Sequence, residues 1–173
     1  MLIKILGAAL IVSGLGGWGL YGARRLRERA RHLQELSMAF GYLEKEITCI
    51  YNPLPLALAH TARFAPEPVA QLFSVSSGLL QGRSGMTARD AWLKGVEKLS
   101  RLSPLEEEEL LLIQSAADQL GASDASGQRK FLSLIQEHLN MAEQTARNRA
   151  QVEQKLYAYG GFIAGLVVVL LLI

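Results

Sequence analysis

The residues that could perform catalysis or bind a metal ion are few in this 173-residue sequence, and they lie far apart. Three histidines, His32, His60 and His138, fall in separate segments, and none has a cysteine or carboxylate at metal-ligand spacing. The only cysteine, Cys49, has no histidine at a spacing that indicates an activated thiol. We therefore expect a protein that is not an enzyme and that binds no metal, cofactor or small-molecule substrate.

Two other motifs have the composition of functional sites but not their pattern. Residues 82–85 (GRSG) lack the preceding strand and the following Lys-Ser/Thr of a phosphate-binding loop. The four glutamates at 106–109 point in different directions around a helix, so they do not form a convergent metal site. Acidic residues are typical of a helix N-terminus, where they face the positive end of the helix dipole. We expect Glu107 or Glu108 to lie on an exposed face that binds a partner.

The distribution of apolar residues divides the chain into three parts. Half of the residues are hydrophobic and 20% are charged, which excludes an intrinsically disordered chain. Residues 5–23 and 156–173 contain no charged side chain, and each stretch approaches the roughly 20 residues that a membrane-spanning helix needs. The first is longer than the apolar part of a signal peptide and lacks a well-placed cleavage site. The sequence predicts transmembrane helices at 1–23 and 156–173 and a helical domain at 24–155.

Basic residues beside these two stretches indicate their orientation. The arginines that follow the first stretch are Arg24, Arg25, Arg27, Arg29 and Arg31. Arg147, Arg149 and Lys155 precede the second stretch, so the positive-inside rule places the domain at 24–155 in the cytoplasm. Because the arginine run starts directly after an apolar stretch, we expect it to contact lipid headgroups at the membrane surface and not nucleic acid.

Small residues in the two apolar stretches favour close packing of membrane helices. Ser13 with Gly17, and Gly161 with Gly165, are small residues four positions apart, a spacing that allows helix backbones to approach in a bilayer. Neither stretch contains the charged residue that usually marks a transport path. An alternative function as a pore-forming or transporter-accessory subunit, which forms a homo-oligomer through these helices, stays open.

Apolar periodicity predicts that the domain is helical. The residues expected in its core recur at spacings of three and four: Leu33, Leu36, Phe40, Leu43, Ile47 and Ile50 in one helix, and Leu132, Ile135 and Leu139 in another. No strand-like alternation is present. The sequence therefore predicts an all-α fold, an antiparallel helical bundle flanked by N- and C-terminal transmembrane helices.

Prolines and capping residues set the expected helix boundaries. Asn52-Pro53 ends the first helix, Thr87 and Asp90 form a capping box, and Ser103-Pro104 is an N-cap followed by proline. The predicted helices are 33–50, 54–64, 67–80, 87–99, 103–120 and one that starts at 128. Residues 143–155 are polar nearly all round, so we expect a bridging stalk that continues into the second membrane helix.

Four stretches, in this order and spacing, resemble the stage III sporulation protein AB family of endospore-forming bacteria. They are the glycine-rich N-terminal span with its arginines, ARHLQELSMAFGYLEKEI with the following NPLPLAL, LGASDASGQ, and the C-terminal GGFIAGLVVVLLLI. The resemblance extends over essentially the whole chain. Family members tend to have an aromatic residue and a threonine ahead of the Pro-Leu corner, where this chain has Cys49 and Asn52, so no role is carried over to those two side chains.

The resemblance implies a function that the composition alone does not. The family is similar to the F domain of type II secretion and type IV pilus platform proteins, whose helical cytoplasmic domains receive a hexameric ATPase. It implies a non-catalytic platform subunit of the channel between mother cell and forespore, located in the mother-cell membrane around the forespore. The implied partners are a secretion-type ATPase and other stage III sporulation channel proteins. The secretion platforms have two such domains and this chain has one, so their stoichiometry is not carried over.

Overall fold

The computed structural model describes the backbone of residues 2–82, 85–120 and 125–172, and the side chains of residues 22, 24–82, 85–120 and 127–153. The described elements are all helical, which confirms the all-α prediction. They are α1 (Leu2–Thr48), α2 (Leu54–Phe64), α3 (Val69–Gln81), α4 (Ala88–Leu102), α5 (Glu107–Gln114), the short 3₁₀ helix η1 (Ser115–Asp118) and α6 (Ala125–Leu172).

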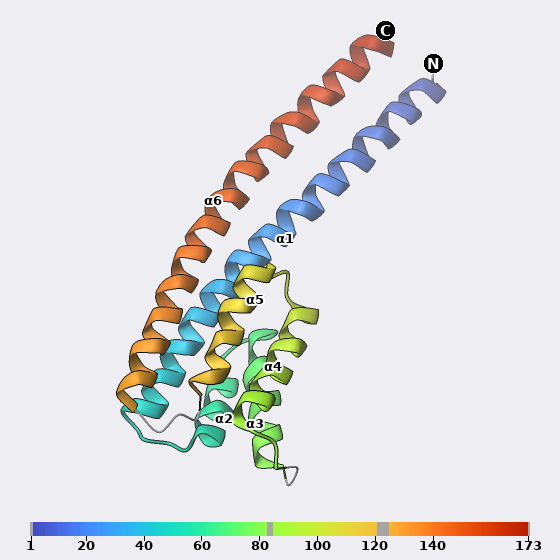
Figure 1. The fold of residues 1–173 in the computed structure, drawn as a ribbon. Coiled ribbons are helices and arrows are strands. Elements are labelled where there is room, and N and C mark those ends of the chain that lie inside the picture. Colours follow the sequence, from blue (N-terminus) through green and yellow to red (C-terminus); the bar gives the residue numbers. More distant parts are fainter. Residues whose placement is uncertain (1, 83–84, 121–124, 173) are drawn as a thin grey trace.

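Two long antiparallel helices, α1 and α6, pack side by side and give the molecule its elongated shape (Figure 1). Both chain termini lie at one end of this pair, and α2 to α5 pack against the other end (Figure 1). Each long helix is uninterrupted, so the apolar stretches at both chain ends are helical and continuous with the bundle.

The structure describes the backbone of the predicted membrane-spanning segments but, apart from Gly22, not their side chains. Within the described part, no helix is both long enough and apolar enough to span a bilayer. For the predicted transmembrane helices at 1–23 and 156–173 the structure describes the backbone of residues 2–23 and 156–172 and no side-chain environment except that of Gly22. The side-chain surroundings of the predicted helix-packing residues Ser13, Gly17, Gly161 and Gly165 are therefore outside the described part.

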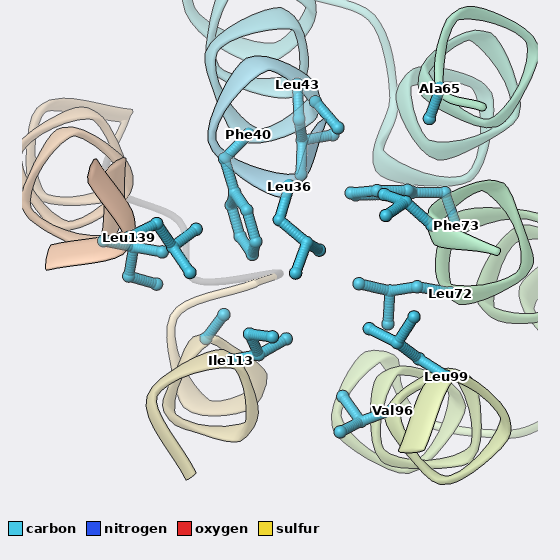
Figure 2. Close-up of a cluster of buried hydrophobic side chains, with 14 of the residues drawn as sticks. Leu36, Phe40, Leu43, Ala65, Leu72, Phe73, Val96, Leu99, Ile113 and Leu139 are labelled. Carbon is cyan, nitrogen blue, oxygen red and sulfur yellow. The ribbon is translucent and has the colours of Figure 1, made fainter. Parts of the chain in front are cut away.

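Large aromatic side chains form the centre of the bundle. Phe40 of α1, Phe73 of α3 and Trp92 of α4 contact one another edge to face, with ring centroids 5.8 to 6.1 Å apart. The Trp92 indole Nε1 donates a hydrogen bond of 2.8 Å to the backbone oxygen of Ile113, so its polar atom is satisfied in the core. Leu139 of α6 points into the same cluster (Figure 2).

The predicted core positions are buried with one exception. Those that are fully or almost fully buried are Leu33, Leu36, Phe40, Leu43, Leu132, Ile135 and Leu139, and Ile47 is partly buried against them. The prediction was wrong for Ile50, which is 58% exposed. The helix ends two residues earlier, at Thr48, and Tyr51 takes a left-handed backbone conformation with φ of 60°, which turns the chain away from the core.

Local capping signals predicted one helix start correctly and one wrongly. The Thr87 side chain accepts a 3.1 Å hydrogen bond from the Asp90 backbone and caps α4. Ser103 does not start the next helix, because it is the C-cap of α4 and its hydroxyl pairs with His32 at 2.7 Å. The helix starts at Glu107 instead, with a reciprocal capping box between Glu106 and Glu109.

Helices α3 and α4 approach so closely that a side chain would not fit between them. A Cβ atom added to Gly95 of α4 would lie 2.4 Å from the backbone oxygen of Leu72 and 2.3 Å from the hydroxyl of Ser76. Both distances are shorter than a van der Waals contact. The glycine therefore fixes the separation of the two helices.

Candidate interaction surfaces

The arginine run of α1 divides into one buried residue and several exposed ones. Arg29 is buried against α5, where its Nε and Nη2 atoms donate hydrogen bonds of 3.0 and 2.8 Å to Glu109. Its Nη1 atom also pairs with Glu106. The side chains of Arg29 and Glu109 are 9% and 5% exposed. The prediction that Arg29 lies at the membrane surface was therefore wrong, because Glu106 and Glu109, at the start of α5, neutralise it inside the fold.

The other four arginines of the run are exposed on α1. Arg24 pairs with Glu28 at 3.1 Å, and Arg31 pairs with Glu35 at 2.8 Å, both one helical turn along. The Arg24–Glu28 pair is exposed and contributes little to stability, about 0.3–0.5 kcal/mol, whereas the Glu35 side chain of the second pair is only 10% exposed. Arg24, Arg25, Arg27 and Arg31 therefore form a basic surface on the part of α1 that leads to the first apolar stretch.

The polar stretch of α6 packs along this part of α1. Ala146 and Ala150 are buried, and Ala150 borders a shallow cavity that Ala30 of α1 also lines. The expected stalk at 143–155 is part of the uninterrupted helix α6, and these two alanines give it a buried face. Two alanines four positions apart supply a narrow buried stripe, because their small side chains let the helices approach.

A second surface surrounds the corner between α1 and α2. The buried carboxylate of Glu46 accepts hydrogen bonds from Asn52 Nδ2 at 2.7 Å and His60 Nδ1 at 2.9 Å, and also pairs with the Tyr42 hydroxyl. Burial alone would raise the pKa of Glu46, but these hydrogen bonds outweigh it and hold the pKa below its ordinary value of 4.5. The same hydrogen bond raises the pKa of Tyr42.

Apolar side chains are exposed around this corner. Ile50, Tyr51 and Phe64 are all more than half exposed, and the Phe64 ring stacks on Tyr42 with centroids 4.7 Å apart. Cys49 is a free, exposed thiol beside them. The α1–α2 connection lies at the end of the molecule opposite the two termini (Figure 1). We call Ile50, Tyr51 and Phe64 the distal apolar patch.

Sequence reasoning did not predict this patch or the hydrogen bonds behind it. Pattern matching assigned Ile50 to the core and carried no role over to Asn52. The sequence feature that indicates this patch is the helix-breaking pair Asn52-Pro53. It marks the end of the helix, and an apolar residue beside a helix end can be exposed.

The predicted partner-binding residues Glu107 and Glu108 are exposed in the first turn of α5. Their neighbours Glu106 and Glu109 bind Arg29, so the four glutamates divide into two that hold α5 to α1 and two that face outwards. This alternation follows from the 100° rotation per residue of a helix. Nothing in the fold requires Glu107 or Glu108 for packing.

The histidines do not form a shared site. His32 is buried next to Ser103, and burial lowers its pKa below the ordinary value of 6.5. His60 belongs to the α1–α2 corner and His138 is exposed on α6. Over the described ranges, no group of three or more histidine, cysteine or acidic side chains is placed to hold a metal ion.

The described elements form a helical bundle on two long antiparallel helices, and both chain termini lie at one end (Figure 1). The class of protein is therefore an all-α bundle built on a long helical pair. The family model for stage III sporulation protein AB matches residues 4–173. A Bacillus subtilis (strain 168) protein, stage III sporulation protein AB, is 32% identical over 171 residues, which are 99% of each chain. A solved structure of stage III sporulation protein AB is 29% identical, has a TM-score of 0.66, and corresponds to 72% of this chain and 97% of that chain. The chain belongs to the stage III sporulation protein AB family.

Proposed function

We propose that this chain is a non-catalytic, membrane-anchored platform subunit of a sporulation complex, and that it docks a cytoplasmic secretion-type ATPase. Membership of the stage III sporulation protein AB family supports a sporulation complex subunit with other stage III proteins as partners. The observation that carries the platform role is the arrangement of α1 and α6, which extend both apolar chain ends from the same end of the helical bundle (Figure 1).

Two apolar ends on one side suit a protein that enters a membrane twice and leaves its bundle on one face. The basic residues beside both stretches support a cytoplasmic location for that face, by the positive-inside rule. In a sporulating cell the proposed location is the mother-cell membrane around the forespore. The bundle would then project towards a soluble partner, with the α1–α2 corner at the end opposite the two termini (Figure 1).

The distal apolar patch is the surface where we place the ATPase. Exposed large apolar side chains can mark a protein interface. Phe64 stacks on Tyr42, which hydrogen-bonds the same Glu46 carboxylate as the corner residue Asn52. Tyr51 is 76% exposed, so its large aromatic ring is accessible to a partner. Its backbone takes the left-handed conformation of the adjacent corner. Glu107 and Glu108 lie on α5, away from this corner, and are the second candidate contact.

Binding of the full-length chain to the cognate ATPase tests the proposal. The chain is reconstituted in lipid nanodiscs, and binding of the purified ATPase is measured by biolayer interferometry. We expect saturable binding that the Tyr51→Asn variant weakens at least about tenfold, because asparagine tolerates the left-handed backbone but lacks the ring. A matched Glu107→Gln/Glu108→Gln variant tests the second surface. Absence of binding to the wild-type chain in nanodiscs and in detergent would refute the ATPase role.

A further inference from the structure

A cavity of about 340 Å³ lies between α1 and α6, beside the buried alanine stripe. The residues that line it come from both helices: Arg27, Ala30, Arg31 and Gln34 from α1, and Arg147, Ala150 and Gln151 from α6. Ala30 and Ala150 are the buried residues of this lining, and the polar residues are exposed. Cavities that bind small ligands begin at about 300 Å³, so this one is large enough for a compact polar group.

Every charged residue that lines the cavity is an arginine. Arg31 and Arg147 each pair with a carboxylate one turn along their own helix, Glu35 at 2.8 Å and Glu143 at 2.7 Å. These contacts use only part of the five N–H donors of each guanidinium. The side chains of both arginines remain more than half exposed, so donors from the two helices can reach a common anion. Arginine forks match the oxygen geometry of a phosphate.

The distance of the cavity from the apolar stretches indicates where such a phosphate comes from. Arg27 lies four residues after residue 23, and Gln151 lies five residues before residue 156, which correspond to about 6 and 7.5 Å along a helix. A headgroup layer is about 5–8 Å thick on each side of the hydrocarbon core. If both stretches span the bilayer, the cavity is therefore at the depth of the cytoplasmic lipid phosphates.

We propose that this cavity binds the phosphate of an anionic phospholipid headgroup through Arg27, Arg31 and Arg147. This proposal rests on the proposed membrane anchoring. It assigns a defined binding site for one lipid, in addition to the general attraction between the basic surface and anionic headgroups. A lipid held between α1 and α6 would fasten the two helices together where the buried apolar side chains are alanines. Buried Arg29 takes no part, since Glu106 and Glu109 already neutralise it.

Thermal unfolding of the full-length chain in neutral detergent tests the site. Short-chain phosphatidylglycerol, short-chain phosphatidylcholine and inorganic phosphate are added separately, and the shift in Tm is followed as a function of concentration. We expect a saturable rise in Tm with phosphatidylglycerol alone. Arg147→Gln should weaken the apparent affinity about tenfold, because it removes a charged hydrogen-bond donor without disturbing the core.

The matched control is Arg25→Gln, which removes one exposed charge from the same run but outside the cavity. The proposal requires this variant to bind phosphatidylglycerol within about twofold of the wild type. Equal losses in both variants would mean diffuse attraction and would overturn the site. An equal effect of inorganic phosphate would assign the cavity to a soluble anion and overturn the lipid ligand. Carbonate extraction of membranes distinguishes these results from failure of the proposed anchoring, since an unanchored chain would be extracted.

Discussion

The bundle and the paired helices that lead to the apolar ends are held together in different ways. In the bundle, large side chains from α1, α3, α4, α5 and α6 converge, as Figure 2 shows for Phe40, Phe73 and Ile113. Along residues 24–32 of α1 and 143–153 of α6, the buried apolar side chains are alanines, and the remaining contacts include arginine–glutamate pairs. Stability is therefore concentrated in the bundle, whereas the paired helices carry arginines whose side chains remain more than half exposed.

The largest effect should come from the aromatic centre of the bundle. Trp92→Ala removes a fully buried ring and its hydrogen bond to Ile113, and we expect a loss of about 4 kcal/mol in the free energy of unfolding. Urea unfolding in detergent measures it. Leu111→Ala, at a residue that is largely exposed on α5, should change stability by less than about 0.5 kcal/mol. Similar losses in the two variants would contradict the described core.

The buried ion pair at the junction of the two regions should give the next largest effect. Arg29→Ala leaves Glu109 buried without its partner, and we expect a loss of about 3 kcal/mol with faster hydrogen exchange in α5. Arg24→Ala breaks an exposed pair on the same helix and should cost less than about 0.5 kcal/mol. The double variant Arg29→Met/Glu109→Leu should recover most of the stability. A double variant as unstable as Arg29→Ala would show that the charges themselves are required.

A pair of glycine substitutions tests the close approach of α3 and α4. Gly95→Ala places a methyl group against the Leu72 backbone, and we expect a loss of about 1–3 kcal/mol. Gly78→Ala lies in the same pair of helices with no atom within 4 Å of the new Cβ, so it should stabilise the chain by about 0.5–1 kcal/mol. Thermal or urea unfolding of the two variants gives the sign of each effect. Stabilisation by both substitutions would contradict the helix separation.

Local sequence signals predicted the helices well and their contacts less well. The Thr87 cap is a contact within three residues, so its pattern is sufficient. Ser103 carries an equally good local signal, but its hydroxyl pairs with His32, which is 71 residues away in the sequence. Arg29 likewise differs from its neighbours only because Glu109 lies opposite, 80 residues later. No local pattern in a single sequence indicates which member of a charged run contacts a partner that is distant along the chain.

Two buried titratable groups should give pH dependence in separate ranges. The pKa of His32 is lowered by burial, although nearby Glu35 opposes the shift, so the unfolded chain binds a proton at higher pH than the folded one. Stability should therefore fall as pH falls below 6.5. The pKa of Glu46 is also lowered, so the stability that its ionised form contributes is present above 4.5 and is lost as pH falls further.

Urea unfolding between pH 8 and pH 3 separates these two effects. His32→Gln should flatten the dependence just below pH 6.5, and Glu46→Gln should flatten it below pH 4.5. Each variant is the control for the other, because His32→Gln should leave the lower range unchanged and Glu46→Gln the upper one. Flattening just below pH 6.5 by Glu46→Gln as strong as that by His32→Gln would contradict the assignment of the upper range to His32.

Labelling of Cys49 tests the proposed membrane arrangement most directly. It is the only cysteine in the chain, it is exposed, and the corner that carries it lies at the end opposite the two termini (Figure 1). A membrane-impermeant maleimide is added to intact vegetative cells that express the chain in their plasma membrane, with permeabilised cells as the positive control. The reagent reaches the outer face of that membrane, whereas it reaches neither face of the membrane around the forespore, so labelling reports the side on which the bundle lies. We predict labelling only after permeabilisation. Equal labelling in intact cells would contradict a cytoplasmic bundle anchored by its two apolar ends.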